Sequence, residues 1–453
     1  MRTFILSPAA LLLLMLPLGA AAQTSASPPD RTTLAAKTKA EFIHAWEGYK
    51  KYATGYDDLL PLSKTGKNWH AHTLMMTPID SLDTMILMGM KEEADKTRAL
   101  IVRDLSFDQD FEVKNFEITI RILGGLLSSY QLTNDKRLLT LADDLGTRLL
   151  PVFNSPTGLP YMFVNLKTGK TSGIESNPAE IGTLILEFGT LSKLTGKDVY
   201  FTKAKKALVE LYKRRDPKTG LIGSSINVET GKWISTSSHI GGGIDSYYEY
   251  LAKCERLFAD AECGAMSKDG LRAVNQYLAD ETPSGLWYGS SEMTTGARTR
   301  TTYGSLQAFL PSVLAFTGDL DHAKRLQDSS FKMWSMNGIE PESLDYKEMK
   351  ITRAGYELRP EIIESAYYLD RYTKDPKYVA MGEVMLNDLI KYCRTDTGYT
   401  ILKDVATKEK GDFMHSFFLA ETLKYAYLLF NPDALDFKGI VFNTEAHPLR
   451  KTW

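Results

Sequence analysis

Four acidic side chains stand where apolar, helix-like segments of the sequence begin. They are Glu117 in "FEITIR", Glu180 in "AEIG", Asp245 in "IDSYYEY" and Glu361 in "LRPE". Hydrolysis of a glycosidic bond needs two carboxyl groups, one that donates a proton to the leaving oxygen and one that activates water or attacks directly. A cleft that also holds arginines and aromatic rings suits a polyhydroxylated ligand. The pattern therefore predicts a sugar-binding site with hydrolytic chemistry.

Helix capping is the alternative interpretation of these residues. Acidic side chains are favoured in the first turn of any helix, because they complement the helix dipole and accept hydrogen bonds from free N–H groups. A surface cap needs no arginine or aromatic neighbour, whereas these acids have Arg121, Tyr247 and Arg359 close by in the sequence. We therefore favour a functional site for the group, and expect simple capping by Asp80 or Ser81 in "IDSLDTM".

The neighbours of two acids suggest their roles. Glu361 follows Pro360 at a helix start and stands beside Arg359, and both features favour its ionised form, which suits a general base. Glu117 has apolar neighbours such as Phe116 and is the better candidate for a general acid, which must hold a proton. Arg121, one turn further on, opposes that assignment.

The elements that carry these acids repeat along the chain. The segments from Phe116 and from Ala179 share the order apolar helix, turn, second helix, Thr-Gly-Leu break and short hairpin. Related breaks at Gly158, Gly220, Gly285, Gly338 and Gly398 are separated by 53 to 65 residues, a period that suits a helix pair plus a loop. The segments 40–53 and 81–101 would form a further pair, and the segment from His415 begins the last one.

The apolar character of the helices indicates how the pairs are arranged. The first helix of each unit is more apolar than the second, so first helices are expected to form an inner layer and second helices an outer one. The last helix, "FFLAETLKYAYLLF", is apolar nearly all round, which favours a closed ring over an open array. We predict an all-α toroid of about seven helix pairs with a β-hairpin accessory at one end, in which the four acids converge at one mouth.

The first 34 residues differ in composition from the rest. One arginine, an apolar run and small residues before Gln23 predict a signal peptide over 1–22, and 23–34 reads as a flexible segment. A single catalytic domain is expected over 35–453. No later apolar stretch is long enough to span a membrane, so we expect an exported protein, periplasmic or secreted.

Charge and cysteine content exclude several classes of partner. The net charge is −2 with both signs interspersed, which favours neither nucleic acid nor a membrane surface as a partner, and we expect a monomer. Cys254 and Cys263 are close enough in the sequence to be bridged, but the sequence alone does not decide whether they are, and no zinc-binding spacing is present. His70 and His72 are interpreted as packing or surface residues.

Taken together, the motifs resemble the family 47 glycoside hydrolases, the class I α-1,2-mannosidases, over nearly the whole predicted domain. The matching segments include "PIDSLDTMILMGM", "FEITIRILGGLLSSYQLT", "IDSYYEYLAK", "LRPEIIES" and "VFNTEAHPL". The resemblance implies an (α/α)7 barrel and an inverting hydrolase that removes terminal α-1,2-linked mannose from mannose oligosaccharides with a bound calcium ion. It implies that Glu117 is the general acid, acting through a water, that Glu361 is the general base, and that Asp245 is the third catalytic acid and rival base.

The resemblance also implies a metal site and a sugar pocket. Calcium would be held by the hydroxyl and carbonyl of Thr444 in "NTEAH", a site without any calcium-loop signature of its own. The residues that would line the sugar pocket are Arg121, Glu180, Arg359, Glu364, Phe417, Glu421 and Glu445.

Three departures from the family pattern narrow these expectations. Ser305 and Ala308 stand in "SLQAF" where many members have a disulfide cysteine motif, and Gly243 replaces a bulky residue that selects glycan branches. The outer subsites are therefore expected to be open, and the few cysteines favour a bacterial enzyme. The rival interpretations are a non-catalytic mannose-glycan-binding protein of the same fold and another (α/α)-barrel carbohydrate enzyme, such as an epimerase or lyase.

Overall fold

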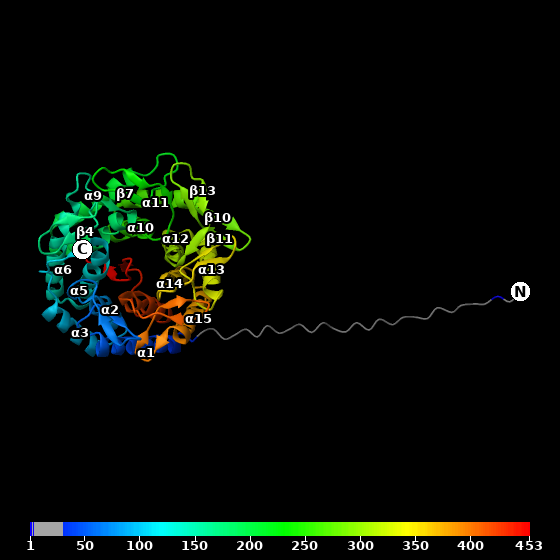
Figure 1. The fold of residues 1–453 in the computed structure, drawn as a ribbon, viewed down its shortest axis with the longest axis horizontal. Coiled ribbons are helices and arrows are strands. Elements are labelled where there is room, and N and C mark those ends of the chain that lie inside the picture. Colours follow the sequence, from blue (N-terminus) through cyan, green and yellow to red (C-terminus); the bar gives the residue numbers. More distant parts are fainter. Residues whose placement is uncertain (2, 4–29) are drawn as a thin grey trace.

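The helices form two concentric layers around a central axis (Figure 1). The computed structural model describes residues 1, 3 and 30–453. Within these residues, the seven inner helices are α2 (Met76–Leu87), α5 (Gly124–Thr133), α8 (Ile185–Thr195), α10 (Asp245–Phe258), α12 (Leu310–Thr317), α14 (Glu361–Thr373) and α16 (Leu423–Phe430). The seven outer helices of the same described part are α1 (Arg31–Tyr52), α3 (Lys91–Asp104), α6 (Lys136–Leu149), α9 (Asp198–Lys213), α11 (Ala261–Tyr277), α13 (Leu320–Ser335) and α15 (Lys377–Tyr392). The predicted (α/α)7 barrel is confirmed.

Burial follows the apolar pattern that separates the two layers. Every residue of α16 is buried, as expected for an inner helix that is covered on all sides. The outer helix α6 buries Leu138, Ala142, Leu145 and Leu149, which form one stripe along the helix, and leaves its charged side chains exposed or half-buried. The main hydrophobic core therefore lies between the layers.

The two ends of the chain close the ring. Helix α1 packs against α16, and Arg31 donates hydrogen bonds to Asp370 Oδ1 (2.6 Å) and to the Leu429 carbonyl (2.6 Å). The expected pairing of segment 40–53 with 81–101 is therefore wrong, because α1 is the outer partner of the last inner helix, and α2 pairs with α3. Asp30 caps α1, so residues 31–34, which we expected to be flexible, are helical. The predicted signal peptide and the residues up to 29 lie outside the described range, apart from residues 1 and 3.

Short helical turns start or interrupt the inner helices. These are α4 (Asn115–Ile118) with the π-helical turn η1 (Thr119–Leu123), α7 (Pro178–Gly182), the 3-10 turn η3 (Ser305–Phe309) and the π-helical turn η4 (Phe418–Thr422); a further 3-10 turn, η2 (Leu150–Asn154), follows α6. π-Helical turns are often found at functional sites because they rotate side chains away from a regular helical register. Here η1 carries Arg121 and η4 carries Glu421.

Small antiparallel sheets surround the starts of the inner helices. The strand β3 (Glu112–Lys114) runs directly into α4 and pairs with the hairpin β4 (Phe163–Asn165) and β5 (Thr171–Ser172). In the same way β6 (Glu175–Ser176) precedes α7 and pairs with β7 (Ser225–Asn227), which pairs in turn with β8 (Trp233–Ser235). The expected hairpin accessory is thus present and recurs, and the hairpin at the end of each of these two repeats pairs with the strand that leads into the first helix of the same repeat.

Two further three-stranded sheets continue this arrangement. They are formed by β9 (Ser237–Ser238), β12 (Ser290–Glu292) and β13 (Arg298–Arg300), and by β14 (Thr302–Gly304), β15 (Ser343–Asp345) and β16 (Lys350–Arg353). Two-stranded sheets are formed by β1 (Asp58–Leu60) with β2 (Thr65–Lys67), β10 (Ala279–Thr282) with β11 (Gly285–Tyr288), β17 (Arg394–Thr395) with β18 (Gly398–Tyr399), and β19 (Leu402–Asp404) with β20 (Glu409–Lys410).

A C-terminal hairpin occupies the centre of the ring (Figure 1, red). It consists of β21 (Ile440–Phe442) and β22 (Pro448–Arg450). Gln131, near the C-terminal end of α5, donates to the Arg450 carbonyl (2.8 Å). The base of the hairpin therefore lies at the end of the barrel opposite to the helix starts, and its tip points along the axis toward them.

One disulfide is formed, between Cys254 on α10 and Cys263 on α11, which settles the pairing that the sequence left open. Cys393 is free and buried. None of the helices within residues 1, 3 and 30–453 combines the length and apolar character that crossing a membrane requires.

Candidate active site

All eleven predicted site residues line one cavity of about 290 Å³ inside the ring. Eight of the lining side chains are carboxylic acids: Glu117, Glu180, Asp245, Glu249, Glu361, Glu364, Glu421 and Glu445. The other predicted residues in the lining are Arg121, Arg359, Phe417 and Thr444. The sequence missed Lys114, Glu249 and Phe309, which also line it. The structure thus brings the predicted set together, while the role of each residue stays a prediction.

The starts of four inner helices deliver the catalytic candidates. Glu117 is the third residue of α4, Glu180 the third of α7, and Asp245 and Glu361 the first of α10 and α14. Capping does not explain Glu180, because the side chain of Asn177 caps α7 by accepting from the Glu180 N–H (3.0 Å). Asp245, in contrast, does accept a hydrogen bond from the first turn of its helix, from the Ser246 N–H (2.9 Å). All four acids nevertheless line the cavity, where the positive ends of the helices favour negative charge.

Glu117 lies between two cations. Its Oε2 accepts from Arg121 Nε (3.1 Å), and Lys114 Nζ lies 3.8 Å from its Oε1. The apolar surroundings expected from Phe116 are thus not the nearest contacts of this carboxyl group. Arg121 also donates to Glu445, so one guanidinium ties a helix-start acid to the tip of the C-terminal hairpin.

Lys114 also contacts the acid of the next repeat. Its Nζ lies 2.6 Å from Glu180 Oε1. Burial nevertheless raises the pKa of the Glu180 carboxyl to about 7, and Lys114 only partly offsets that effect. Lys114 therefore joins the first two acids on this side of the cavity.

The surroundings of Glu361 differ from the expectation. Burial raises the pKa of the Glu361 carboxyl to about 7, although Arg359 acts in the opposite direction. The guanidinium of Arg359 does not bond Glu361; it donates from Nε and Nη2 to the two oxygens of Glu342, at 3.1 Å each. Burial thus outweighs the arginine and the helix end, which we expected to keep Glu361 ionised. Glu361 Oε2 has no hydrogen-bond partner among the described residues, which leaves it available to a ligand or a water.

Asp245 stands beside an ion pair that the sequence analysis missed. Burial raises the pKa of Asp245 to about 7, and the charges of Glu249 and Glu361 add to the effect. Glu249, one turn further along α10, pairs with Lys253, and both are buried. The spacing of four residues between Asp245, Glu249 and Lys253 places all three on one helix face, and this signal could have identified the pair.

The hairpin tip is held rigidly. Asn443 Oδ1 accepts from the N–H groups of Glu445 (3.0 Å) and His447 (2.8 Å), and its Nδ2 donates to Glu187 Oε1 (2.8 Å). The Thr444 N–H donates to the Tyr250 hydroxyl (3.3 Å). Within residues 30–453, nothing donates a hydrogen bond to the hydroxyl or carbonyl oxygen of Thr444. Both oxygens therefore remain available to a ligand at the cavity floor.

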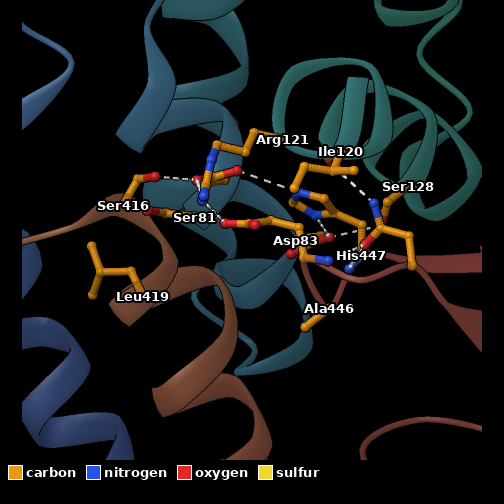
Figure 2. A network of polar contacts seen from close by, with 12 residues as sticks. Ser81, Asp83, Ile120, Arg121, Ser128, Ser416, Leu419, Ala446 and His447 are labelled. Atoms are coloured by element: carbon orange, nitrogen blue, oxygen red, sulfur yellow. Dashed lines mark hydrogen bonds and ion pairs between the residues drawn. The ribbon is translucent and has the colours of Figure 1, made fainter. Parts of the chain in front are cut away.

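Beneath this tip, buried charges form the network of Figure 2, around His447 and Asp83. The ring of His447 contacts Asp83 Oδ2 through Nδ1 (2.7 Å) and Asp80 Oδ1 through Nε2 (3.3 Å). Lys424 Nζ lies 2.7 Å from Asp83 Oδ1 and donates to the Ala446 carbonyl (2.7 Å). Burial alone would lower the pKa of His447, but Asp83 and Asp80 raise it to about 9. The protonated ring of His447 thus joins the hairpin to α2 through its contacts with Asp80 and Asp83.

The expected capping by Asp80 or Ser81 is wrong. Helix α2 begins at Met76, so Asp80 lies inside it and belongs to the buried network, and Ser81 donates to the Thr77 carbonyl (2.6 Å). The free N–H groups at the start of α2 are instead satisfied by Asp57, whose carbonyl accepts from the Thr77 N–H (3.2 Å). Because the capping residue, Asp57, is distant in the sequence from the start of α2, the residues next to that helix start could not predict it.

The oxygen atoms at the cavity floor are of the kind that bind a hard cation. Burial raises the pKa of Glu421 well above its usual range, and the charges of Glu445 and Glu361 add to it. A bound divalent cation would relieve this repulsion, and the available ligands are all oxygen atoms, as calcium prefers. A second group, Cys254, Cys263 and Asp260, has ligand atoms within 4.8 Å of one another, but its two sulfurs form the disulfide and offer no thiolate.

Gly243 lines the rim of the cavity. Its φ angle is +91°, and a Cβ atom there would meet no atom closer than 3.6 Å, on Asn177. A side chain at this position would extend into the cavity mouth, so the glycine leaves this part of the rim open. The position is consistent with the expectation of open outer subsites.

A closed ring of paired helices with a carboxylate-lined pit on its axis defines a carbohydrate-active enzyme of the (α/α)7 type. Residues 41–451 match the model of glycosyl hydrolase family 47, so the chain belongs to this family and is a glycoside hydrolase. It is 37% identical over 447 residues to Alpha-mannosidase I MNS5 of Arabidopsis thaliana, covering 91% of this chain and 76% of the relative. It is 36% identical over 460 residues to the human ER degradation-enhancing alpha-mannosidase-like protein 2, covering 93% and 78%.

A solved structure agrees with this assignment. The alpha-1,2-mannosidase from Trichoderma reesei superimposes with a TM-score of 0.85 and 29% identity, covering 92% of this chain and 99% of that one. The family membership that the motifs suggested is confirmed.

Proposed function

We propose that the protein is a calcium-dependent, inverting exo-α-1,2-mannosidase that removes terminal α-1,2-linked mannose from mannose oligosaccharides. The observation that carries the proposal is the gathering of eight carboxyl groups in one pit whose floor is closed by the C-terminal hairpin. A pit with a closed floor admits the end of a sugar chain and not its middle, which favours exo action. The relatives named as mannosidases support mannose as the sugar.

In this proposal Glu361 is the general base. It takes a proton from a water while that water attacks the anomeric carbon from the face opposite the leaving group. The free Oε2 of Glu361 suits this task, and Arg359, held by Glu342, provides a fixed positive charge beside it. Asp245 is the rival base, since burial raises its pKa to the same value of about 7.

Glu117 supplies the proton to the leaving oxygen, through a water. Its contacts with Arg121 and Lys114 fix the carboxyl group at the mouth side of the pit. A water between Glu117 and the glycosidic oxygen would carry the proton across, so the carboxyl group need not touch the sugar. The sugar itself would be positioned by Glu180, Glu364, Phe417, Glu421 and Glu445.

Thr444 is the proposed ligand for calcium, through its hydroxyl and carbonyl oxygens. When bound, the ion would supply positive charge at the floor and hold hydroxyl groups of the sugar. The rigid hairpin tip and the network under His447 keep the two Thr444 oxygens in place.

Release of mannose from α-1,2-mannobiose, with and without a calcium chelator, tests the proposal. We expect turnover that stops on chelation and returns with added calcium. NMR of the first product should show β-mannose, because inversion at the anomeric carbon requires it. A first product with the α configuration, or turnover that is indifferent to chelation, would contradict the proposed mechanism.

A non-catalytic glycan-binding protein of the same fold is the second candidate. It is favoured by the similarity to the alpha-mannosidase-like protein named above. Binding of mannobiose at neutral pH in the presence of calcium, without any release of mannose, would support it over the enzyme. The epimerase or lyase alternative conflicts with the membership in a glycoside hydrolase family.

We also propose that the protein is exported, to the periplasm or the medium, and acts as a monomer. The composition of residues 1–22 supports export. N-terminal sequencing of the exported protein should begin at Gln23, and light scattering coupled to gel filtration should give the mass of one chain. A retained leader or a dimer mass would contradict the respective statement.

A further inference from the structure

Trp69 is a partly exposed indole at the end of the barrel where the inner helices begin. It lies in the connection between β2 and α2, two residues after the end of β2 and seven before the first residue of α2. Its exposed fraction is 36%, unusual for the largest apolar side chain in a chain that buries most of its aromatic rings. Neither the catalytic proposal nor the hydrophobic core uses this exposed face.

Buried acids hold the indole in place. The Trp69 N–H donates to Asp57 Oδ2 (3.0 Å), and its ring Nε1 donates to Asp58. The other oxygen of Asp57 accepts from Thr73 Oγ1 (2.8 Å) and the Leu74 N–H (2.9 Å), which fixes the rest of the connection. Asp57 and Asp58 are fully buried. The ring is therefore held rigid before any ligand arrives, which lowers the entropic cost of binding to it.

The indole is continuous with the cavity through a series of planar groups. The guanidinium of Arg121 lies 5.4 Å from the Trp69 ring and 5.7 Å from the Phe417 ring. Phe417 lines the cavity and stacks on His415 at 4.6 Å, and Phe413 packs against His415 at 4.4 Å. Trp69 does not itself line the cavity. The Trp69 ring therefore lies just outside the cavity and contacts Arg121, which is part of the cavity lining.

We propose that Trp69 is the platform of an outer subsite that binds the apolar face of a mannose unit remaining outside the pit while the terminal residue is inside. Pyranose rings present C–H groups on one face, and rigid aromatic rings bind such faces with little loss of conformational freedom. Hydroxyl groups at the edge of the sugar would find charged partners nearby in Lys67, above the Phe413 ring at 5.2 Å, and in Glu357, paired with His415. This inference rests on the proposed function, since it assumes a mannose oligosaccharide.

A purely structural role is the competing explanation. The indole could serve only to satisfy Asp58 and to cover Arg121. In that case its loss would weaken binding of every ligand that depends on Arg121, whatever the length of that ligand. An outer subsite predicts a different result, because a disaccharide leaves little sugar outside the pit and a longer chain leaves more.

Three variants separate these explanations. Trp69→Ala removes the platform, Trp69→Phe keeps a smaller ring over Arg121 but loses the Nε1 donor, and Trp453→Ala is a matched control that removes an indole of similar exposure, 38%, stacked on Phe258. Dissociation constants for α-1,2-mannobiose and α-1,2-mannotetraose are measured in the Glu361→Gln background. The ratio of kcat/KM for the two sugars is measured in otherwise unchanged enzyme.

We expect the protein with Trp69 to bind mannotetraose about tenfold more tightly than mannobiose, which corresponds to one good stacking contact. Trp69→Ala should lose this preference, Trp69→Phe should keep part of it, and Trp453→Ala should keep all of it. Mannotetraose should also shift the tryptophan emission, and the shift should be absent from Trp69→Phe. A retained preference, or an equal loss for both sugars, overturns the subsite.

The two proposals fail in different ways. If wild-type enzyme releases no mannose from either sugar, the catalytic proposal fails, and the binding constants still decide about Trp69. If both sugars are hydrolysed and the variants keep the wild-type ratio, the enzyme stands and the subsite does not.

Discussion

Replacement of His447 by glutamine tests how the floor of the site is held. The imidazole is fully buried between Asp83 and Asp80, and these acids raise its pKa to about 9, against an ordinary value of 6.5. The difference corresponds to about 3 kcal/mol of stability. The same pairing lowers the pKa of Asp83 to about 2, through Lys424 and His447 and against the effect of burial. We count only the His447 shift, since both describe one interaction and only the histidine titrates near neutral pH.

The sign of the effect follows from the direction of the shift. Because the folded-state pKa of His447 is the higher one, its stabilisation is fully present below pH 6.5 and is lost as the pH rises through 9. His447→Gln cannot titrate. The free energy of unfolding of the wild-type protein, relative to that of the variant, should therefore fall by about 3 kcal/mol between pH 6.5 and pH 10.

Denaturant unfolding in calcium-free buffer, at intervals between pH 6.5 and 10, measures this difference. His239→Gln is the control: burial lowers the pKa of His239 to about 4, so its ring is neutral in the folded protein over the whole range. That variant should keep the wild-type dependence on pH. If the difference in unfolding free energy between wild type and His447→Gln does not change with pH, His447 is not held as a protonated ring by Asp80 and Asp83.

Three further changes have expected outcomes. Glu361→Gln should lower kcat by about a thousandfold while mannobiose still binds, because only proton abstraction is lost; near-normal turnover would transfer the base role to Asp245. Thr444→Ala should weaken calcium binding measured by calorimetry and sugar binding with it, whereas Thr444→Ser should retain both; unchanged calcium affinity in the alanine variant would place the metal elsewhere. Glu340→Leu should raise the free energy of unfolding at pH 8 by about 1 kcal/mol or more, since both carboxyl oxygens are buried without a partner within residues 30–453 and burial raises the pKa well above 4.5. Because this folded-state pKa is raised, the part of the gain that comes from the buried charge should be lost below pH 4.5, where the carboxyl group is protonated in both states, and a gain that does not fall there would contradict the reasoning.

The sequence predicted the elements whose signals are local and repeated. Glu117, Glu180 and Asp245 could be placed on one face because each follows the same kind of helix start, and a ring of equal units must bring equal positions together. The inner and outer layers followed from the apolar residues alone, as the fully buried α16 illustrates.

The features that the sequence did not reveal depend on contacts between distant segments. The start of α2 is satisfied by Asp57 and not by a neighbouring side chain, so Asp80 was misplaced. Burial at the bottom of a pit governs the charge state of Glu361, and burial cannot be read from the two residues beside it. Thr444 is proposed as a metal ligand on the family resemblance alone, because a hydroxyl on a terminal hairpin has no local signature of metal binding.

The position of the C-terminal hairpin has a consequence for how the enzyme becomes active. Thr444, Glu445 and His447 follow every barrel helix of residues 30–453 in the sequence, and α1 cannot complete the ring until α16 has been made. Such contacts between sequence-distant segments form late in folding, because the loop they close is long. A chain that stops short of the hairpin would carry Glu117, Asp245 and Glu361, the three proposed catalytic acids, and the floor of the cavity would be missing. The cavity is therefore complete only after the chain has been made through β22.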